Sequence, residues 1–309
     1  MVCILLVLFA LLILDLYIVD SAARYLCDRT YTKNPKLFFG QREKKVNTKS
    51  KSRQRAKNLE KTVTQRYEIT ADDGAKLVGH YYPCDNAKRV VIAVHGWKSS
   101  WSYDFNAQAE FLHNNACSVL FIELRAHGES EGRYMYYGKR ERFDLQKWAE
   151  LAEKEIADGL PIYFYGMSMG STLSVMASDL FGSSVKGIIA DGVTPTPRIV
   201  MKSIVKSINL SPALFYWQIR IDLRLRLKCD DNDYTALMAL ENCKTPILMP
   251  YGTADVLTTP AMSMQVFDKI KAPKKAIRFD GAGHMKSYYT DPEKYQNALL
   301  QFFCDCENE

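Results

Sequence analysis

One serine lies in a turn that is typical of a reactive nucleophile. Ser168 is the central residue of Gly166-Met167-Ser168-Met169-Gly170, between an apolar run over residues 162–165 and a stretch with helical spacing. A strand, a sharp turn and a helix are the parts of a nucleophile elbow, in which flanking glycines avoid clashes with both elements. The pattern predicts Ser168 as the nucleophile of an acyl-transfer reaction. The alternative is a turn of glycine and serine without chemistry.

A serine hydroxyl attacks only when a base removes its proton, so a histidine has to meet Ser168 in space. Of the five histidines, only His284 follows Ser168 in the chain. It ends Asp280-Gly281-Ala282-Gly283-His284, a loop straight after a predicted strand, where an imidazole can reach over the edge of the sheet. The other four lie in a predicted strand, a predicted helix or upstream glycine turns: His80, His113, His95 and His127. We therefore predict His284 as the base, against the alternative of a lone surface histidine.

An acidic residue has to fix the tautomer of the imidazole and stabilise the imidazolium. Asp255 ends a turn, Tyr251-Gly252-Thr253-Ala254-Asp255, that follows the apolar run before the histidine strand. We expect Asp255 to be this acid. Asp191, which follows the run over residues 187–190, is the main alternative, and Asp280 lies too close to the histidine backbone to be favoured.

Negative charge that develops on a carbonyl oxygen needs backbone donors already in place. The amide of Met169, directly after the serine, is one candidate. His95-Gly96-Trp97 ends the first long apolar run and brings a second loop to the same edge, so Trp97 is the expected second donor. We interpret His95 as a residue that orders this loop. Trp97 and Trp101 are alternatively walls of an acyl pocket or packing residues.

From residue 67 onward, short apolar runs alternate with longer amphipathic stretches. This alternation is typical of a mostly parallel twisted sheet with helices on both faces. A hairpin is expected at residues 67–70 and 77–82, around Asp73-Gly74. Further strands are expected at residues 89–94, 119–124, 162–165, 187–190, 247–251 and 275–279, and helices at 104–114, 141–157, 171–180, 261–270 and 292–303.

One insertion interrupts the alternation, at about residues 192–240. Val200, Ile204 and Ile208 have helical spacing, whereas apolar and charged residues alternate strictly over residues 219–228, as in a strand. The secondary structure of this segment stays undecided. Its position at the carboxyl edge of the sheet predicts a small cap over the site.

These motifs, in this order, resemble those of the α/β-hydrolase superfamily, in particular its bacterial branch that overlaps serine aminopeptidases and small esterases. The resemblance rests on Ile92-Ala93-Val94-His95-Gly96-Trp97, on Glu123-Leu124-Arg125-Ala126-His127-Gly128-Glu129-Ser130-Glu131-Gly132, and on the segments 166–170, 252–255 and 281–284. It covers residues 67–309 and implies the α/β-hydrolase fold, a triad of Ser168, Asp255 and His284, an oxyanion hole at Trp97 and Met169, and no metal or organic cofactor. Glu123 replaces the usual aspartate and Ala126 the usual glycine, both in a structural loop.

An apolar segment precedes this body. Residues 2–19 are apolar except for Asp15 and, as a helix, reach roughly 27 Å, just enough for a hydrocarbon core. We expect an uncleaved transmembrane anchor over residues 1–20. A signal peptide cleaved at Ser21-Ala22-Ala23 is the alternative, although no Lys or Arg precedes the apolar run. A buried core helix is a third interpretation, which the polar tail that follows disfavours.

Basic residues are concentrated directly after this segment. Residues 21–66 contain 14 Lys or Arg against Asp28, Glu43 and Glu60. The positive-inside rule predicts a single-pass cell-membrane protein with its body in the cytoplasm. We interpret residues 21–66 as a basic linker, which either lies on anionic headgroups or is a solvated tether, and residues 67–309 as the hydrolase domain.

Composition sets further limits. With 309 residues, 47% of them hydrophobic, the chain is large enough to bury a substantial core. The net charge of +6 resides in the linker, and the body is net negative, which argues against binding of nucleic acid. The eight cysteines lack the paired spacing of a zinc site and do not settle the compartment.

The sequence thus predicts a membrane-tethered serine hydrolase that cleaves a carboxylic ester or thioester of a small-molecule or lipid acyl substrate. A serine aminopeptidase or amidase on the same residues is an alternative, for which Glu123, Glu129 and Glu131 would supply an acidic pocket. An acyltransferase would share the acyl-enzyme. A binding protein that uses this fold without catalysis is the non-enzymatic alternative, and the oligomeric state is not predicted.

Overall fold

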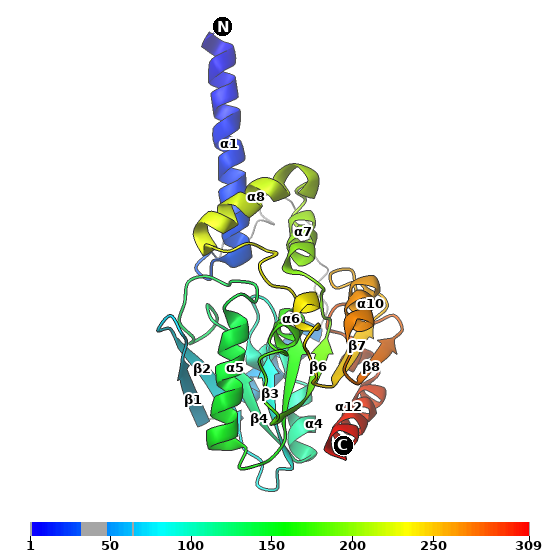
Figure 1. The fold of residues 1–309 in the computed structure, drawn as a ribbon. Helices are drawn as coiled ribbons and strands as arrows, with labels where there is room; N and C mark the ends of the chain where they lie inside the picture. The colour runs from blue at the N-terminus through cyan, green and yellow to red at the C-terminus, as the bar shows by residue number, and fades with distance from the viewer. Residues whose placement is uncertain (1, 32–47, 64, 309) are drawn as a thin grey trace.

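The computed structural model describes residues 2–31, 48–63 and 65–308, and within them eight strands form one sheet (Figure 1). The strands are β1 (Gln65–Thr70), β2 (Lys76–Tyr82), β3 (Arg89–Val94), β4 (Cys117–Ile122), β5 (Ile162–Met167), β6 (Val185–Asp191), β7 (Ile247–Gly252) and β8 (Lys274–Phe279), in the spatial order β1-β2-β4-β3-β5-β6-β7-β8. β2 is antiparallel to both of its neighbours, and the other pairings are parallel. The predicted architecture, a mostly parallel sheet after an initial hairpin, is confirmed.

Helices cover both faces of this sheet. The helices of the body are α3 (Trp101–Asp104), α4 (Gln108–Asn114), α5 (Glu141–Leu151), α6 (Met169–Met176), α9 (Ala236–Ala239), α10 (Pro260–Lys269), α11 (Ser287–Thr290) and α12 (Pro292–Glu307). α5, α6, α9 and α10 pack on one face, whereas α3, α4 and α12 pack on the other. α5 continues into a π-helical turn over Ala152–Ile156, so the predicted helix at residues 141–157 is nearly all helical.

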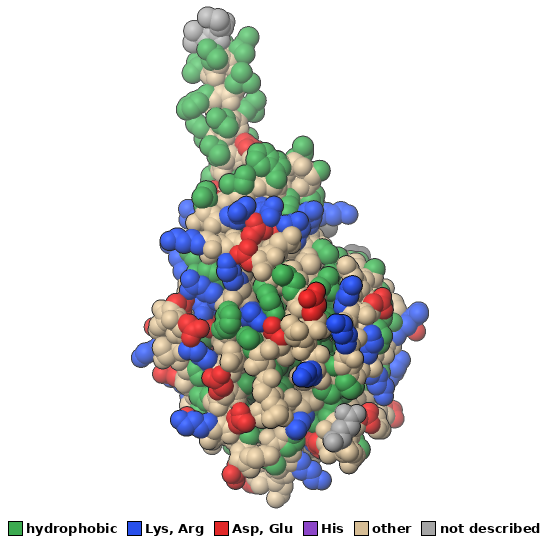
Figure 2. All heavy atoms as spheres, in the orientation of Figure 1, with side chains coloured by type: hydrophobic (Ala, Val, Ile, Leu, Met, Phe, Trp, Pro, Cys, Tyr) green, Lys and Arg blue, Asp and Glu red, His purple; other side chains and the backbone are tan. Residues whose placement is uncertain are grey.

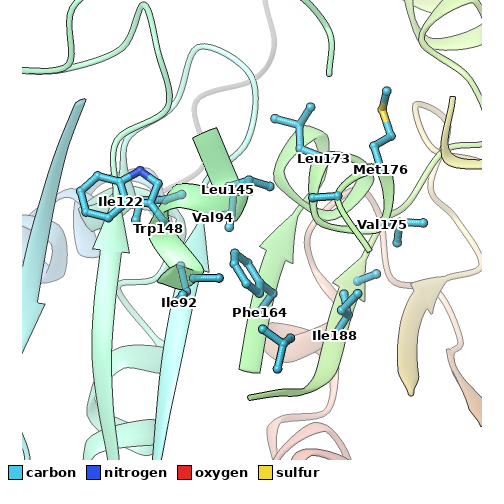
Figure 3. Packing of buried hydrophobic residues seen from close by; sticks show 14 of the residues in the cluster. Ile92, Val94, Ile122, Leu145, Trp148, Phe164, Leu173, Val175, Met176 and Ile188 are labelled. Atoms are coloured by element: carbon cyan, nitrogen blue, oxygen red, sulfur yellow. The ribbon is translucent and has the colours of Figure 1, made fainter. Parts of the chain in front are cut away.

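The central strands are buried on both faces because successive side chains point in opposite directions. In β3, Val90 and Ile92 belong to the core under α5 and α6, while Val91 and Ala93 belong to the core under α4 and α12. Figure 3 shows side chains of neighbouring strands in the first of these cores, with Trp148 of α5 at one end of the cluster and Val175 of α6 toward the other. Continuous apolar runs therefore give central strands here, as expected for a parallel sheet.

Several predicted elements of the body have other bounds in the structure. The helix predicted at residues 171–180 ends at Met176, and the helix predicted at residues 292–303 continues to Glu307. The predicted helix at residues 104–114 is wrong at its start, because Ser100 caps α3 and residues 105–107 separate α3 from α4. The strand predicted at 119–124 begins and ends two residues earlier. It ends early because the Leu124 amide donates to the ring of His95, at 3.1 Å, and so leaves the pattern of the sheet.

The insertion forms a helical cap rather than a strand. It contains α7 (Pro197–Ser207) and α8 (Pro212–Leu227). In α8 every second residue between Ile219 and Leu227 is apolar, yet Ile219, Leu223 and Leu227 are buried whereas Ile221 and Leu225 are exposed. The strand-like alternation arises because the helix has apolar residues on two opposite sides and charged residues between them.

The N-terminal segment is one helix, α1 (Val2–Cys27), which projects from the cap in Figure 1. It continues past the predicted boundary at residue 20, and its end from Val19 to Cys27 is buried against α7 and α8. The prediction of a linker over residues 21–66 is therefore wrong at this end. It is also wrong at residues 48–62, which form α2 (Thr48–Thr62). Several basic residues on which the positive-inside prediction rests lie outside the described residues: Lys33, Lys36, Arg42, Lys44 and Lys45.

α2 packs on the body although its sequence has no clear apolar period. Ala56 and Val63 are buried, and Leu59 contacts the core beneath α3. The Ser102 hydroxyl of α3 donates to the Glu60 carboxylate at 2.5 Å. Tertiary contacts thus hold a helix that the local pattern does not reveal.

Two strand glycines allow aromatic rings of the covering helices to approach the sheet. A Cβ atom at Gly79 would lie 2.9 Å from the ring of Trp148 in α5. A Cβ atom at Gly187 would lie 2.8 Å from the ring of Phe302 in α12. Because interiors are close-packed, neither ring can move away without disturbing its core.

We predict that Gly187→Ala destabilises the fold by about 1–3 kcal/mol, because the added methyl group overpacks the contact with Phe302. Urea unfolding of the detergent-solubilised chain measures this change. Gly182→Ala is the matched control, since the nearest atom to its Cβ would be the Ser184 hydroxyl at 3.9 Å. Equal stability of the two variants would contradict the packing argument.

Candidate active site

The turn between β5 and α6 forces Ser168 into an unusual backbone conformation. Its φ is 53° and its ψ is −116°, a strained combination for a residue with a side chain. The Ser168 amide donates to the carbonyl of Asp191 on the neighbouring β6, at 2.8 Å. The strain is thus held by the sheet, and the hydroxyl stands clear of the backbone.

The glycines on each side of this serine are required by close backbone contacts. A Cβ atom at Gly166 would lie 2.4 Å from the carbonyl oxygen of Gly170. A Cβ atom at Gly170 would lie 2.1 Å from the carbonyl oxygen of Val94, at the end of β3. Both contacts would be with backbone atoms, which cannot rotate away as the end of a flexible side chain could. The prediction that glycines flank Ser168 to avoid clashes with the strand and the helix therefore agrees with the geometry.

A line of hydrogen bonds joins Ser168, His284 and Asp255. The Ser168 Oγ lies 2.8 Å from His284 Nε2, and His284 Nδ1 lies 2.8 Å from Asp255 Oδ2. A carboxylate accepts only, so Nδ1 carries the proton and Nε2 is left to accept from the serine hydroxyl. The structure brings together the three residues that the sequence predicts, from loops after β5, β7 and β8.

The carboxylate of Asp255 is buried and held by its own loop. Its Oδ1 accepts from the amides of Leu257 and Thr258, both at 2.9 Å, and its Oδ2 accepts from the Thr258 hydroxyl at 2.6 Å. Burial opposes ionisation, but the bonds from His284 and Thr258 outweigh it and hold the pKa of Asp255 below its usual value. Asp255 is therefore a fixed anion beside the imidazole.

Thr258 is a contact that sequence reasoning missed. Its hydroxyl lies 3.2 Å from His284 Nδ1 as well as 2.6 Å from Asp255 Oδ2. An aspartate followed three residues later by a threonine is a local pattern for side-chain bonds to a turn, and that pattern was available in the sequence.

Asp191, the main alternative acid, lies at the end of β6 but does not bond to His284. Its Oδ2 accepts from the Tyr295 hydroxyl at 2.9 Å, and Tyr295 in turn accepts from Tyr165 at 2.7 Å. Burial raises the pKa of Asp191 to about 7, so the carboxyl group is partly protonated near neutral pH. The geometry favours Asp255 over Asp191 as the partner of the histidine.

The two amides predicted as oxyanion donors are not used elsewhere in the described part of the chain. Met169 is the first residue of α6, where helix geometry leaves the amide without a helical acceptor. The amide of Trp97 likewise has no acceptor among the described residues. Gly96 approaches the serine closely, since its Cβ would lie 3.4 Å from that of Ser168. Both amides are thus available to donate, and the loop that carries Trp97 approaches Ser168 at Gly96.

Buried polar groups hold the loop that carries Trp97. The Asp104 carboxylate accepts from the Gly96 amide at 2.7 Å and from the Ser99 hydroxyl at 2.6 Å. Burial raises the pKa of Asp104, and these bonds partly offset it. The break at residues 105–107 ends α3 at Asp104, whose carboxylate contacts the loop after β3.

Two histidines complete the support of this loop. His95 Nε2 accepts from the Leu124 amide and His127 Nε2 accepts from the Lys98 amide, at 3.1 and 3.0 Å. Burial lowers the pKa of His95 to about 3 and that of His127 to about 4, so both rings are neutral. Their role is to order the loop, as interpreted for His95.

A mostly apolar cavity of about 300 Å³ opens over the serine. Trp97, Tyr103 and Tyr137 line it from the body, and Val200 and Ile204 line it from α7 of the cap. This volume lies in the range of cavities that bind small molecules. The expected position of the cap over the site agrees with this lining.

The last turn of α1 contacts two residues that line this cavity. The Leu26 carbonyl accepts from the Trp97 indole at 3.1 Å and from the Tyr137 hydroxyl. The ring of Tyr25 meets the Trp97 ring edge to face, with centroids 5.3 Å apart. Sequence reasoning missed this contact, because no local pattern relates residues 25 and 97.

The acidic residues suggested for an amine pocket lie elsewhere. Glu123 is buried, faces His80 and accepts from the amide of Glu129. Glu129 and Glu131 are exposed, and none of the three lines the cavity. In the same loop Ala126 has a φ of 61°, a conformation that suits the glycine usual at this position.

The described residues contain no group of three or more His, Cys, Asp or Glu side chains that could hold a metal ion.

The chain resembles known proteins in sequence. Residues 85–235 match the family model for serine aminopeptidase, S33, a range that includes Ser168 but ends before Asp255 and His284. The chain is 22% identical to the Bacillus subtilis (strain 168) protein YqkD over 252 residues, 79% of each chain.

Solved structures share the fold. The esterase Pf2001 of Pyrococcus furiosus superposes with a TM-score of 0.65 at 21% identity, over 81% of this chain and 93% of the esterase. Est1E of Butyrivibrio proteoclasticus, solved with ferulic acid, superposes with a TM-score of 0.62 at 18% identity, over 79% of this chain and 100% of Est1E. With its eight-stranded sheet, its glycine-flanked serine turn and these likenesses, the chain has the α/β-hydrolase fold.

Proposed function

We propose that this protein is a membrane-tethered serine hydrolase that cleaves a carboxylic ester or thioester through an acyl-enzyme. The observation that carries the proposal is the line of hydrogen bonds from Ser168 through His284 to the buried Asp255, at the floor of an apolar cavity. The family match and the esterase neighbours support the same class of reaction.

In the first half of the reaction, the Ser168 oxygen forms a bond to the carbonyl carbon of the substrate, and its proton passes to His284 Nε2. The carbonyl electrons move onto oxygen, where the amides of Met169 and Trp97 stabilise the negative charge. When the carbonyl re-forms, the bond to the leaving group breaks, and the alcohol or thiol takes the proton from His284. Asp255 stabilises the transient imidazolium.

In the second half, a water molecule attacks the acyl-serine and gives its proton to His284 Nε2. The bond between the acyl carbon and the serine oxygen then breaks, and that oxygen recovers the proton. The acid is released and the enzyme returns to its starting state. The neutral tautomer that the Asp255 contact selects is the one that accepts a proton at Nε2 in each half.

A serine aminopeptidase is the second candidate, because the matching family model is described by that activity. Asp104 is the only carboxylate that lines the cavity within the described residues. Each of its oxygens already accepts a hydrogen bond from the loop after β3, and burial raises its pKa, so an ion pair with a substrate amine is disfavoured. The cavity therefore favours esters and thioesters over peptides with a charged amino terminus.

The membrane anchor is proposed to stay uncleaved. The small residues Ser21-Ala22-Ala23, where a signal peptidase would cut, lie within α1, and Ala22 and Ala23 are buried against the cap. Beyond them, Asp28 forms an ion pair with Arg133 of the body at 3.0 Å. Cleavage would remove a helix that the cap packs against, and the basic residues that follow favour a cytoplasmic body.

We predict that Ser168→Ala lowers hydrolysis by about 10⁴-fold or more while the unfolding midpoint stays unchanged. Acyl nitrophenyl esters and aminoacyl anilides are the two substrate classes to compare, and only the esters should be turned over by the wild type. A fluorophosphonate probe should label the wild type but not the variant. Ser203→Ala is the control, because the Ser203 hydroxyl donates to the carbonyl of Ile199 in its own helix and to no other described residue. Failure of the wild type to react with the probe would favour a binding protein without catalysis.

The assignment of the acid predicts different results for two similar substitutions. Asp255→Asn should lower kcat/KM for a nitrophenyl ester by about 10³–10⁴-fold, because an amide cannot fix the required tautomer of His284. Asp191→Asn should leave kcat/KM near the wild-type value, since Asp191 bonds to Tyr295 rather than to the histidine. Steady-state kinetics at neutral pH distinguish the two, and the opposite order would assign the role to Asp191.

The uncleaved anchor predicts that protein extracted from cell membranes has the intact mass of the full chain. A mature chain that begins after Ala23 would contradict the proposal. Protease added to intact cells should leave the body uncut, and digestion from outside would place the body on the other side of the membrane.

A further inference from the structure

α8 carries an apolar stripe that the protein does not cover. Leu214, Trp217, Ile221 and Leu225 recur at intervals of three or four residues, and we call them the outer stripe. Their exposed fractions are 65%, 59%, 49% and 75%. The opposite side of the same helix, with Tyr216, Ile219, Leu223 and Leu227, is buried against α1 and α7. A helix that is apolar on two opposite sides needs a second apolar partner, and no other described segment covers the outer stripe.

The outer stripe lies beside the point where α1 leaves the cap. The exposed apolar residues of α1 end at Tyr17, and from Val19 onward its apolar residues are buried or partly buried. Asp20, just beyond, forms an ion pair with Arg226 near the end of α8. α8 therefore crosses α1 at the level where its exposed apolar part ends, as Figure 1 shows.

Cations flank the outer stripe. α7 and α8 together contain six Lys and Arg residues, and Lys228 follows directly after α8. The arginines form ion pairs with Asp222 of α8 and with Asp230 and Asp231 just after it. The remaining cations are Lys202, Lys206 and Lys228. Lys202, Lys206, Arg224 and Lys228 are exposed. Figure 2 shows hydrophobic side chains along the projecting part of α1 and on the adjoining cap, with Lys and Arg in a band beneath them.

We propose that α8 lies on the surface of the bilayer that α1 crosses, with its outer stripe inserted at the boundary between headgroups and acyl chains. This inference rests on the membrane anchor of the proposed function. Apolar residues next to a band of cations match the two layers of an anionic membrane surface, hydrocarbon and headgroup, in the order in which α1 meets them. Trp217 has the side chain that most often occupies this boundary.

The docked helix also fixes the site relative to the membrane. α8 packs on α7, and Val200 and Ile204 of α7 line the cavity over Ser168. The last turn of α1 holds Trp97 and Tyr137 of the same cavity through the Leu26 carbonyl. An acyl substrate that resides in the bilayer thus needs to move only from the lipid beside the cap into an apolar cavity.

The test uses the full chain in vesicles of phosphatidylcholine and phosphatidylglycerol. Of the four tryptophans, Trp217 alone is largely exposed, since Trp101 and Trp148 are buried and Trp97 is partly buried. Lipids brominated close to the headgroup should quench the fluorescence of the wild type more strongly than lipids brominated at the chain end. In Trp217→Phe this depth-dependent quenching should fall by about threefold. Equal quenching of the wild type and the variant would overturn the proposal.

A second comparison measures the effect on the reaction. Trp217→Ser combined with Leu225→Ser should lower hydrolysis of an ester embedded in these vesicles by about tenfold and leave hydrolysis of a soluble nitrophenyl ester unchanged. Met238→Ser, at an apolar residue of the body that is 45% exposed, is the matched control. Equal loss on both esters, or a change in oligomeric state without a change in quenching, would contradict docking on lipid.

Failure of the inference and failure of the proposed function are separable. Extraction of the wild type by alkaline carbonate would show that α1 is not an anchor, and absence of fluorophosphonate labelling would show that Ser168 is not reactive. Neither result depends on the outer stripe. If the chain is anchored and Ser168 is labelled, the quenching of Trp217 tests only whether α8 lies on the lipid.

Discussion

The contact between the start of α6 and the end of β3 is the constraint on which the site depends. A Cβ atom at Gly170 would lie 2.1 Å from the Val94 carbonyl, so only glycine permits the approach. This contact brings the first amide of α6 and the loop after β3 together above one serine. The strained backbone of Ser168 follows from the same geometry, because the chain must reverse from strand to helix within one residue. The position of the Ser168 hydroxyl and the approach of the loop after β3 therefore depend on this backbone contact, while Asp104, His95 and His127 hold that loop in place.

The N-terminal helix extends this dependence beyond the hydrolase body. Leu26 holds Trp97 by a hydrogen bond to its indole, and the amide of the same tryptophan is the proposed second oxyanion donor. The cap packs on α1 through an apolar cluster that includes Ile204, which also lines the cavity. The proposed anchor is also part of the fold, because the buried end of α1 contributes to the core of the cap. The body from residue 67 alone would lack these contacts.

The sequence predicted the parts of the fold and of the site that local patterns determine. Apolar runs gave the central strands, and the glycine-flanked serine and the loop glycines before His284 gave residues that the structure joins by hydrogen bonds. The sequence did not reveal contacts between distant segments, such as α2 on α3 or Leu26 on Trp97, because neither has a local signature. It was ambiguous for α8, since residues that alternate along a strand also place apolar groups on two opposite sides of a helix. The composition of the linker likewise hid a helix that only packing stabilises.

The two aspartates at neighbouring strand ends, Asp191 and Asp255, show how burial and hydrogen bonding give two similar carboxyl groups different pKa values. Asp191 is buried and receives one tyrosine hydroxyl, so burial dominates and its pKa rises to about 7. Asp255 receives two amides, a threonine hydroxyl and the imidazole, which together lower its pKa despite burial. Only a carboxyl group that stays ionised can stabilise an imidazolium as it forms. A base at the position of His284 could therefore be served by Asp255 near neutral pH, whereas Asp191 would first have to lose a proton that its surroundings favour.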